Sequence, residues 1–246
     1  MTKAQIKFIQ SLSRQKYRKE YNAYLVEGDK NAKEWLQSDI KIQSIAVSGT
    51  WLQENEALVK NHPEAEVMVA EAFELEKITS MQHAQEVVLI VEQPATPVYR
   101  QQEGQWHLYL EKIQDPGNMG TIIRTADWFG IRQLICSLDC VEVYNPKVVQ
   151  ASMGSLLRMD IIEMEPETFV QENTLPLYVT SLSGSNIKTV SDLSPGVIAM
   201  GNESKGISVI MSAAASQQLY IPGLGSAESL NVAVATGIIC AELILR

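Results

Sequence analysis

The sequence is poor in cysteine and lacks both a long apolar run and an N-terminal signal pattern. Its 246 residues include three cysteines, an odd number that is too small for a disulfide framework. No segment approaches the roughly 18 consecutive apolar residues of a membrane-spanning helix. The basic residues near the N-terminus are scattered and precede no apolar core, unlike those of a secretory signal. We therefore expect a soluble, cytoplasmic protein without a membrane partner.

Patterns typical of metal sites and catalytic histidines are also missing. Cys136 and Cys140 are four residues apart, but no other cysteine or histidine is close to them in the sequence. We therefore expect no zinc site and no other metal. The three histidines, His62, His83 and His107, are scattered, and we interpret each as a surface or packing residue.

Positive charge is concentrated at the N-terminus of an acidic chain. The formal net charge is −9, yet residues 1–30 hold seven basic and three acidic side chains. Residues 31–105 and 106–246 have net charges of −7 and −6. The basic segment Arg14–Lys19, with its interleaved tyrosines, fits RNA binding, in which bases stack on rings and cations hold phosphates. It also fits a solvated amphipathic helix at a chain end, which composition alone favours.

Hydrophobic periodicity predicts two α/β units. With 46% hydrophobic and 20% charged residues the chain can fill a sizeable core, and its length suits two domains. In the first half we expect helices at 3–12, 14–22, 29–37 and 51–60, and strands at 23–27, 42–47, 66–69 and 86–92. In the second half we expect strands at 107–111, 133–136, 177–180, 197–200 and 218–221, and helices at 118–130, 145–152, from 207, and 229–244. Apolar strands separated by helices indicate a mostly parallel sheet covered on both faces.

An aperiodic segment separates the two halves. Residues 93–105 contain two prolines, a glycine and four glutamines, a composition typical of a linker. We therefore expect a domain at 1–95, a linker at 96–105 and a second domain at 106–246.

The first of three loops that follow predicted strands is Asp115–Asp127. Parallel sheets bind ligands beyond the carboxyl ends of their strands, so such loops are the places to look for a site. Asn118 can cap the helix that follows, and Gly120 lets the backbone approach closely. Gly120 and Arg124 are expected to share an exposed helix face, where a guanidinium can reach a phosphate or a developing oxyanion.

The other two loops argue against common nucleotide sites. Met200–Gly206 has two glycines five residues apart like a P-loop, but its lysine precedes the second glycine and Ile207, not Ser or Thr, comes next. Ile221–Asn231 contains Gly-Leu-Gly, but an acidic residue stands where a dinucleotide fingerprint needs its third glycine. Instead, Ser229 or Asn231 can cap the apolar helix that follows or face a substrate. This loop suits a ligand that is not highly anionic.

Taken together, the three loops resemble the motifs of the SpoU/TrmH branch of the SPOUT-class RNA ribose 2′-O-methyltransferases. The first motif is Asn-x-Gly-x-x-x-Arg at Asn118–Arg124, the second is Met-Gly-Asn-Glu-Ser-Lys-Gly at Met200–Gly206, and the third is Ile-Pro-Gly followed by Glu-Ser-Leu-Asn-Val-Ala within Ile221–Ala233. A fourth stretch, Tyr144–Arg158, is also similar, but it has Gln150 where the family usually places Arg.

The resemblance implies a fold, a cofactor and partners. The fold is α/β, with a C-terminal SPOUT-type parallel-sheet domain that contains a trefoil knot. Residues 1–92 are similar to the L30e-like RNA substrate-binding domain that often precedes it. S-adenosylmethionine is the implied methyl donor, with cofactor contacts at Gly201, Ile221 and Leu230, and the implied assembly is a homodimer. A neutral adenosine with a sulfonium needs main-chain hydrogen bonds and an apolar wall rather than a cationic cradle.

The same resemblance assigns activation of the ribose 2′-hydroxyl to Arg124. A guanidinium has a pKa above about 12 and does not normally lose its proton. We therefore expect Arg124 to stabilise developing alkoxide charge and to hold the adjacent phosphate, while Asn118, Ser229 and Asn231 orient the nucleotide. Glu203 is expected to favour the cationic cofactor or to organise its loop.

Ribosomal RNA is the expected substrate, and other functions stay open. A tRNA ribose 2′-O-methyltransferase would use the same fold. A non-catalytic RNA-binding paralogue with a decayed cofactor pocket would keep the fold without the chemistry. An NAD-dependent enzyme ranks behind both because the dinucleotide fingerprint is incomplete.

Overall fold

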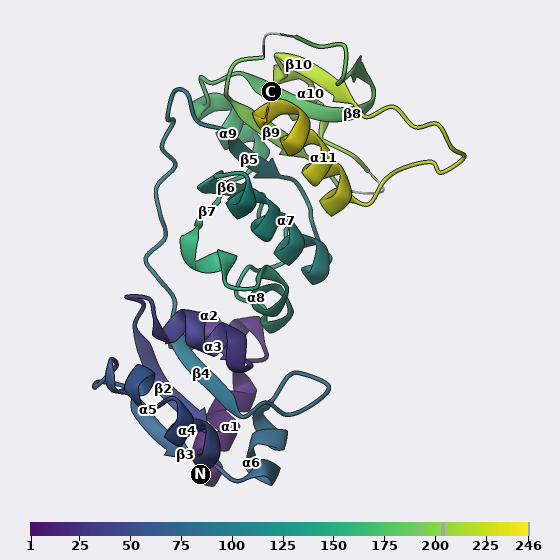
Figure 1. Ribbon diagram of the computed structural model, residues 1–246. Helices are drawn as coiled ribbons and strands as arrows, with labels where there is room; N and C mark the ends of the chain where they lie inside the picture. Colours follow the sequence, from purple (N-terminus) through teal and green to yellow (C-terminus); the bar gives the residue numbers. More distant parts are fainter. Residues whose placement is uncertain (192, 203–204, 246) are drawn as a thin grey trace. The chain divides into compact units, whose positions relative to one another are not determined.

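The chain forms two compact units, and one of them is built from two separate pieces of sequence. The structure is a computed structural model, and it describes residues 1–191, 193–202 and 205–245 (Figure 1). The first unit contains Met1–Ala95 and Glu142–Leu157, and the second contains Thr96–Val141 and the residues from Arg158 onward. Among the described residues, none of the helices combines the length and apolarity that crossing a bilayer requires.

The first unit contains a mixed four-stranded sheet in the order β1-β4-β2-β3. Strand β4 runs antiparallel to both β1 and β2, whereas β2 and β3 are parallel. The strands are β1 (Ala23–Glu27), β2 (Ile42–Val47), β3 (Glu66–Val69) and β4 (Val87–Glu92), close to the predicted ranges. One core of this unit joins β1, β2, β3 and β4 to two flanking helices through Leu25, Ala46, Met68, Ile90, Ile9 and Leu75.

The helices of the first unit depart from the sequence-based prediction at two places. They are α1 (Lys3–Ser11), α2 (Gln15–Tyr21), α3 (Asp29–Leu36), α4 (Gly49–Glu54), α5 (Glu56–Lys60), α6 (Ala72–Ile78) and α8 (Pro146–Ser152). The single helix predicted at 51–60 is wrong, because Asn55 leaves helical geometry and its side chain donates to the carbonyl of Trp51 at 2.9 Å. Helix α6 was not predicted; its capping box uses Glu71 and Glu74 rather than the usual Ser or Thr.

The second unit contains a six-stranded sheet in the order β10-β8-β9-β5-β6-β7, and every pairing in it is parallel. Its strands are β5 (His107–Leu110), β6 (Gln133–Cys136), β7 (Asp160–Glu163), β8 (Leu177–Asn186), β9 (Val197–Met200) and β10 (Gln217–Tyr220). Because β5, β6 and β9 are buried at every position, the sheet is covered on both faces, which confirms the prediction. The carboxyl ends of these strands share one edge, where the three candidate loops begin.

Helices α7 (Pro116–Trp128), α9 (Pro166–Glu172), α10 (Val209–Ala214) and α11 (Val232–Ile244) belong to the second unit. Phe169 of α9 and Met211 of α10 pack in one core with Tyr109 of β5. Helices α7 and α11 lie side by side (Figure 1). Strand β7 and helix α9 were not predicted, because each is short and has few apolar side chains.

The segment between the two sheets has no helix or strand from residue 93 to 106. Its second half is nonetheless attached to the second unit. The hydroxyl of Tyr99 donates to Oδ1 of Asn173 at 2.9 Å, and Oε1 of Gln101 accepts the main-chain N–H of Thr174 at 2.7 Å. These side-chain contacts hold part of the predicted linker in place.

Residues 142–157 pack into the first unit through polar and aromatic contacts. The Nε group of Arg18 donates to both carboxylate oxygens of Glu142 at 3.1 and 3.0 Å. The ring of Tyr144 lies 4.7 Å from that of Tyr24. Arg18 is only 2% exposed, so the prediction that the whole basic segment can face RNA is wrong for this residue, which instead neutralises a buried carboxylate.

Candidate active site

The first candidate loop leads into α7 and is capped by Asp115. Its Oδ1 accepts the main-chain N–H of Asn118 at 2.7 Å, and Pro116 occupies the first turn, where no amide hydrogen is needed. The expectation that Asn118 caps this helix is therefore wrong, because the helix starts before it. Asn118 lies in the first turn of α7, with its side chain available to a neighbouring loop.

Arg124 lies farther along α7 with its side chain exposed to solvent. Gly120 is buried in the same helix, so the expectation that Gly120 and Arg124 share an exposed face is wrong. Gly120 lies among buried residues of α7, while Arg124 points away from them. Within the described part of the chain, Arg124 forms no salt bridge, so its charge is available to an anion.

The second candidate loop follows β9 and is folded tightly on itself. The main-chain N–H of Gly206 donates to the carbonyl of Asn202 at 2.8 Å. A Cβ atom on Gly201 would come within 2.4 to 2.6 Å of main-chain atoms of Gly206 and Ile207, so no larger residue fits without moving the loop. Glu203, one of the predicted site residues, lies outside the described residues.

Asn202 connects the second loop to the first. Its Nδ2 group donates to the carbonyl of Lys112 at 3.0 Å, and its Oδ1 accepts the main-chain N–H of Lys205 at 3.2 Å. Lys112 has a φ of +58°, a left-handed conformation that is unusual for a residue with a side chain. Sequence reasoning did not find Lys112 or Asn202 as site residues, because neither a backbone torsion angle nor a loop-to-loop hydrogen bond leaves a local sequence pattern.

The third candidate loop runs from Ile221 to Asn231 and extends away from the sheet (Figure 1). Residues 223–231 are exposed, including Ser229 and Leu230. Asn231 ends the loop and caps α11, because its Oδ1 accepts the main-chain N–H groups of Ala233 at 3.0 Å and Val234 at 3.3 Å. Of the two roles left open for Asn231, the structure therefore shows helix capping.

Asn231 also joins the third loop to the first. Its Nδ2 group donates to Oδ1 of Asn118 at 2.9 Å, across 113 positions of sequence. The first turns of α7 and α11 are therefore held together by two amide side chains. The structure thus brings Asn118 and Asn231 together, whereas Ser229 and Leu230 lie on the exposed part of the loop.

A buried carboxylate supports the base of this site. Glu111, which follows β5, is 1% exposed, and its Oε2 accepts the main-chain N–H of Ser208 at 2.9 Å. Ser208 in turn caps α10. Glu111 was not among the predicted site residues, although a carboxylate directly after an apolar strand is a signal that could have pointed to it.

Two cysteines lie beside the first loop. The main-chain N–H of Ile113 donates to Sγ of Cys140 at 3.4 Å. A hydrogen bond from Cys136 lowers the pKa of Cys140 to about 7, while the same contact and burial raise the pKa of Cys136. Within the described residues no group of three or more His, Cys, Asp or Glu side chains is placed to hold a metal ion.

The sequence matches two known protein families. Residues 105–241, more than half of the chain, match the family described as "SpoU rRNA Methylase family". The chain belongs to the SpoU rRNA methylase family. Residues 3–89 match a second family, described as "MRM3-like substrate binding domain", which agrees with the substrate-binding domain expected at the N-terminus.

Relatives of this SpoU family member extend over nearly its whole length. The 23S rRNA (guanosine(2553)-2′-O)-methyltransferase RlmP of Bacillus subtilis is 26% identical over 97% of this chain and 95% of its own. A Porphyromonas gingivalis structure described as a TrmH-family RNA methyltransferase is 33% identical, covers 98% of this chain and 97% of its own, and has a TM-score of 0.85. An AdoMet-bound rRNA methyltransferase from Sinorhizobium meliloti is 31% identical, covers 98% and 94%, and has a TM-score of 0.87.

One residue that departs from the SpoU family pattern forms a hydrogen bond with a buried side chain. Gln150, which stands where the family usually has Arg, lies on α8, and its Oε1 accepts Nδ2 of Asn31 at 3.1 Å. Asn31 is 3% exposed. In this member of the family, Gln150 therefore contacts a buried side chain of the first unit.

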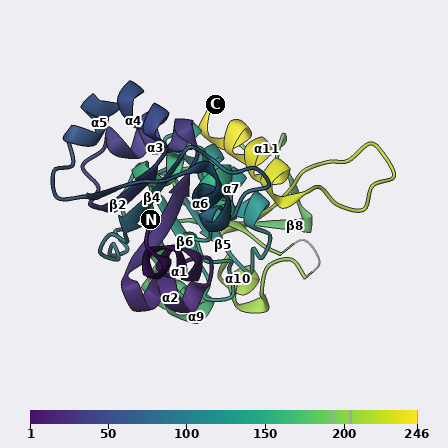
Figure 2. The same ribbon diagram turned by 90° about the horizontal axis from the view of Figure 1, so that it is seen from below.

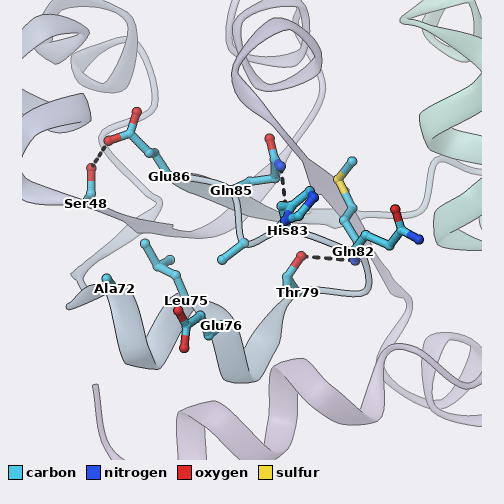
Figure 3. Close-up of a pocket in the computed structure, with 11 residues that line it drawn as sticks. Ser48, Ala72, Leu75, Glu76, Thr79, Gln82, His83, Gln85 and Glu86 are labelled. Carbon is cyan, nitrogen blue, oxygen red and sulfur yellow. Dashed lines mark hydrogen bonds between the residues drawn. The ribbon is translucent and has the colours of Figure 1, made fainter.

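A cavity of about 620 Å³ lies in the first unit and is lined by residues between Ser48 and Glu86 (Figure 3). Its lining includes His83, Gln85 and two carboxylates, Glu76 and Glu86, and no lysine or arginine. Ser48 donates to Oε1 of Glu86 at 3.2 Å at its edge. Because its charged groups are acidic, the cavity does not suit a phosphate.

Proposed function

We propose that this chain transfers a methyl group from S-adenosylmethionine to a ribose 2′-hydroxyl of ribosomal RNA. The observation that carries the proposal is the junction of the first and third loops. There Asn118 and Asn231 are hydrogen-bonded at the starts of α7 and α11, and the exposed Arg124 projects from the same α7. Membership of the SpoU family and the rRNA methyltransferases among the relatives support the same reaction.

Arg124 is proposed to act as an electrostatic group. A guanidinium is a poor base, so the proton of the ribose hydroxyl is proposed to pass to solvent water while the methyl group moves from the sulfonium to the 2′-oxygen. The guanidinium of Arg124 instead stabilises negative charge that develops on the 2′-oxygen and binds the neighbouring phosphate. The exposed position of Arg124 on a regular helix suits this role. The guanidinium can be reached by an RNA phosphate, and the helix fixes the position of the Arg124 backbone.

Asn118, Ser229 and Asn231 are proposed to orient the nucleotide. The three residues differ in their contacts. Asn231 uses its Oδ1 to cap α11 and its Nδ2 to donate a hydrogen bond to Asn118. Asn231 therefore acts mainly through the position of Asn118, whereas the exposed Ser229 is free of such a structural task in the described residues. Glu203 remains a proposed site residue in the second loop.

Gly201, Ile221 and Leu230 are the residues proposed to hold S-adenosylmethionine, which supplies an electrophilic methyl group on a sulfonium when it is bound. The chemistry of the available groups fits this compound. Leu230 is 46% exposed and Leu224 is fully exposed, so aliphatic side chains are available to cover an adenine. The tight turn at Gly201 offers main-chain groups. A neutral adenosine needs this combination, whereas a polyphosphate would need several cations.

The two units are proposed to divide binding and chemistry. Residues 1–95 are proposed to bind the RNA substrate, and residues 106–246, of which 142–157 pack in the first unit, are proposed to carry the methyltransferase site and a C-terminal trefoil knot. A Cβ atom on Gly184 in β8 would come within 2.7 Å of main-chain atoms of Gln218 and Leu219. This close approach lies where the register between the paired strands β8 and β10 shifts, so it belongs to the irregularity in that pair. The protein acts in the cytoplasm, where ribosomal RNA is available.

A homodimer is also part of the proposal. Helix α11 has a single charged residue, Glu242. Large apolar side chains remain exposed on and beside α7 and α11: Trp128 is 85% exposed, Val234 52% and Leu245 71%. Burial of these side chains against a second copy would remove apolar surface from water. Equilibrium ultracentrifugation should show a dimer, and Val234→Asp should shift it toward monomer.

The test of the proposed function uses S-adenosylmethionine with an isotopically labelled methyl group. The purified protein is incubated separately with large-subunit rRNA, small-subunit rRNA and tRNA, and the RNA is digested to nucleosides for mass spectrometry. We expect the label on the ribose of an rRNA nucleoside. Label on a base, or on tRNA alone, would contradict the proposal. Failure to bind S-adenosylmethionine in calorimetry would instead indicate a non-catalytic RNA-binding protein.

A further inference from the structure

Positive charge predominates in the first nineteen residues. They contain six basic side chains and no acidic one. Five of the six are exposed, and none of these five forms a salt bridge with another residue that the structure describes. These five are Lys3, Lys7, Arg14, Lys16 and Lys19.

Three other lysines of the first unit are paired with carboxylates. Lys33 lies 2.7 Å from Asp29, Lys41 lies 2.8 Å from Glu92, and Lys60 lies 2.9 Å from Glu56. Lys30, Lys77 and Lys147 form no salt bridge with a described residue either, but each lies on a different helix, whereas the five N-terminal cations lie close together in the sequence on and beside α1 and α2. The N-terminal segment is therefore positively charged, although the whole chain has a net charge of −9.

Arg18 holds α2 in the orientation that exposes these cations. Its Nη1 group donates to the carbonyl of Leu12 at 2.8 Å, while the rest of the guanidinium contacts Glu142. With Arg18 turned inward, Lys16 and Lys19 lie toward solvent. Glu20 is the one acidic residue in α2.

An aromatic row lies along the same two helices, which Figure 2 shows close together at the N-terminus. The rings of Tyr17 and Tyr21 are stacked, with centroids 6.2 Å apart and an angle of 12° between their planes. Phe8 of α1 meets Tyr21 edge-on at 5.1 Å. Tyr21 is 42% exposed, so the row ends at the surface with part of a ring uncovered.

We propose that these features form an RNA-binding surface, the α1–α2 platform, made of the five exposed cations and Tyr21. The cations bind phosphates of the RNA backbone, and an unpaired base stacks on Tyr21. The inference rests on the proposed function, since it assigns to one face of the first unit the capture of the RNA that the second unit methylates. An unpaired base is required because a base inside a duplex has no exposed ring face.

The test compares three lysines of the platform with three lysines outside it. The full-length variant K7Q/K16Q/K19Q and the control K33Q/K41Q/K60Q change the net charge equally. Binding of a fluorescein-labelled RNA stem–loop is measured by anisotropy over a series of salt concentrations. We expect the platform variant to bind more weakly and to lower the slope of log K against log salt by about 2, from roughly 0.7–0.9 for each phosphate contact. The control should keep the slope of the unmodified protein.

Two single variants separate charge from stacking. Tyr21→Leu keeps an apolar contact for Phe8 but removes the ring, so RNA affinity should fall at least about fivefold while the salt slope stays unchanged. Glu20→Gln removes the acidic residue of α2 and should strengthen RNA binding. Circular dichroism and urea denaturation check that each variant keeps the fold of the first unit, where the substitutions lie.

The outcomes distinguish this inference from the proposed function. If K7Q/K16Q/K19Q binds RNA with the affinity and salt slope of the unmodified protein, the platform is not an RNA site, even if methyl transfer proceeds. If the unmodified protein transfers no methyl group but the platform variants lose RNA binding, the proposed reaction fails and the platform stands.

Discussion

The two units differ in where some polar contacts between distant segments lie. In the first unit, polar groups from distant segments are buried in pairs, such as Arg18 with Glu142 and Asn31 with Gln150. The second unit also buries one such contact, between Glu111 and Ser208, but its Asn231–Asn118 contact connects two loops near the surface. Buried pairs contribute to stability and register, because a lost partner leaves an unsatisfied polar group. Under the proposed function, the loop-to-loop contacts position groups for chemistry, and the exposed Arg124 supplies the positive charge.

The strongest way to break this comparison is to remove Arg18. In Arg18→Met the carboxylate of Glu142 stays buried without a partner, so the free energy of unfolding should fall by about 3–5 kcal/mol. Urea denaturation followed by tryptophan fluorescence measures it. The surface ion pair between Arg158 and Asp127 is the control: Arg158→Met should cost no more than about 1 kcal/mol. Equal costs for the two variants would contradict the contrast between the units.

The second prediction concerns Arg124, an exposed residue of the second unit that should affect catalysis more than stability. Arg124→Ala should lower the rate of methyl transfer at saturating RNA by roughly 10²–10³, because a preorganised charge donor is lost from the transition state. The free energy of unfolding should change little, since the side chain is exposed. Arg124→Lys keeps the charge but not the planar fork and should recover only part of the rate. Near-normal turnover by the alanine variant would show that Arg124 does not stabilise the reacting oxygen.

Asn231 combines a stabilising and a positioning role, and two variants can separate them. Asn231→Ala removes the cap of α11 and the bond to Asn118, so it should cost about 0.5–2 kcal/mol of stability and also slow methyl transfer. Asn231→Asp keeps an oxygen that can cap the helix but lacks the Nδ2 donor for Asn118. It should therefore retain stability and still slow the reaction. Full activity in the aspartate variant would show that Asn231 does not act by positioning Asn118.

The smallest expected effect is on the pH dependence of stability, and it comes from His107, a buried side chain of the second unit. Burial lowers the pKa of His107 below its usual value, so the unfolded chain binds its proton more readily than the folded one. The stabilising contribution is therefore complete above about pH 6.5 and is lost as the pH falls toward the folded-state pKa. The loss is about 1.4 kcal/mol for each unit of pKa depression.

Thermal unfolding of the unmodified protein and of His107→Gln between neutral and mildly acidic pH measures this effect. The variant should lose less stability on acidification because it has no proton to gain at this position. Parallel curves for the two proteins would exclude His107 as the source of the pH dependence.

Much of the fold follows from local sequence, but several predicted details were wrong. Alternating and continuous apolar runs placed the buried strands, and the three glycine-containing loops at the ends of β5, β9 and β10 were found as candidate loops. The cap of α7 was misplaced because Asp115, Pro116 and Asn118 are all residues that favour helix starts, and sequence alone does not decide among them. Gly120 was placed on the wrong face because helical spacing does not show which side the protein covers.

By itself, the sequence determined the apolar strands, the charge reversal at the N-terminus and the motif-bearing loops, since each depends on neighbouring residues. Only the tertiary structure decided which side chains meet. It joined Asn231 to Asn118 across 113 positions, placed Glu142 against Arg18 across 124, and left the other N-terminal cations exposed. Hydrogen bonds and burial act over a few ångströms in space, and two residues that the chain separates by a hundred positions become neighbours only through the folded core.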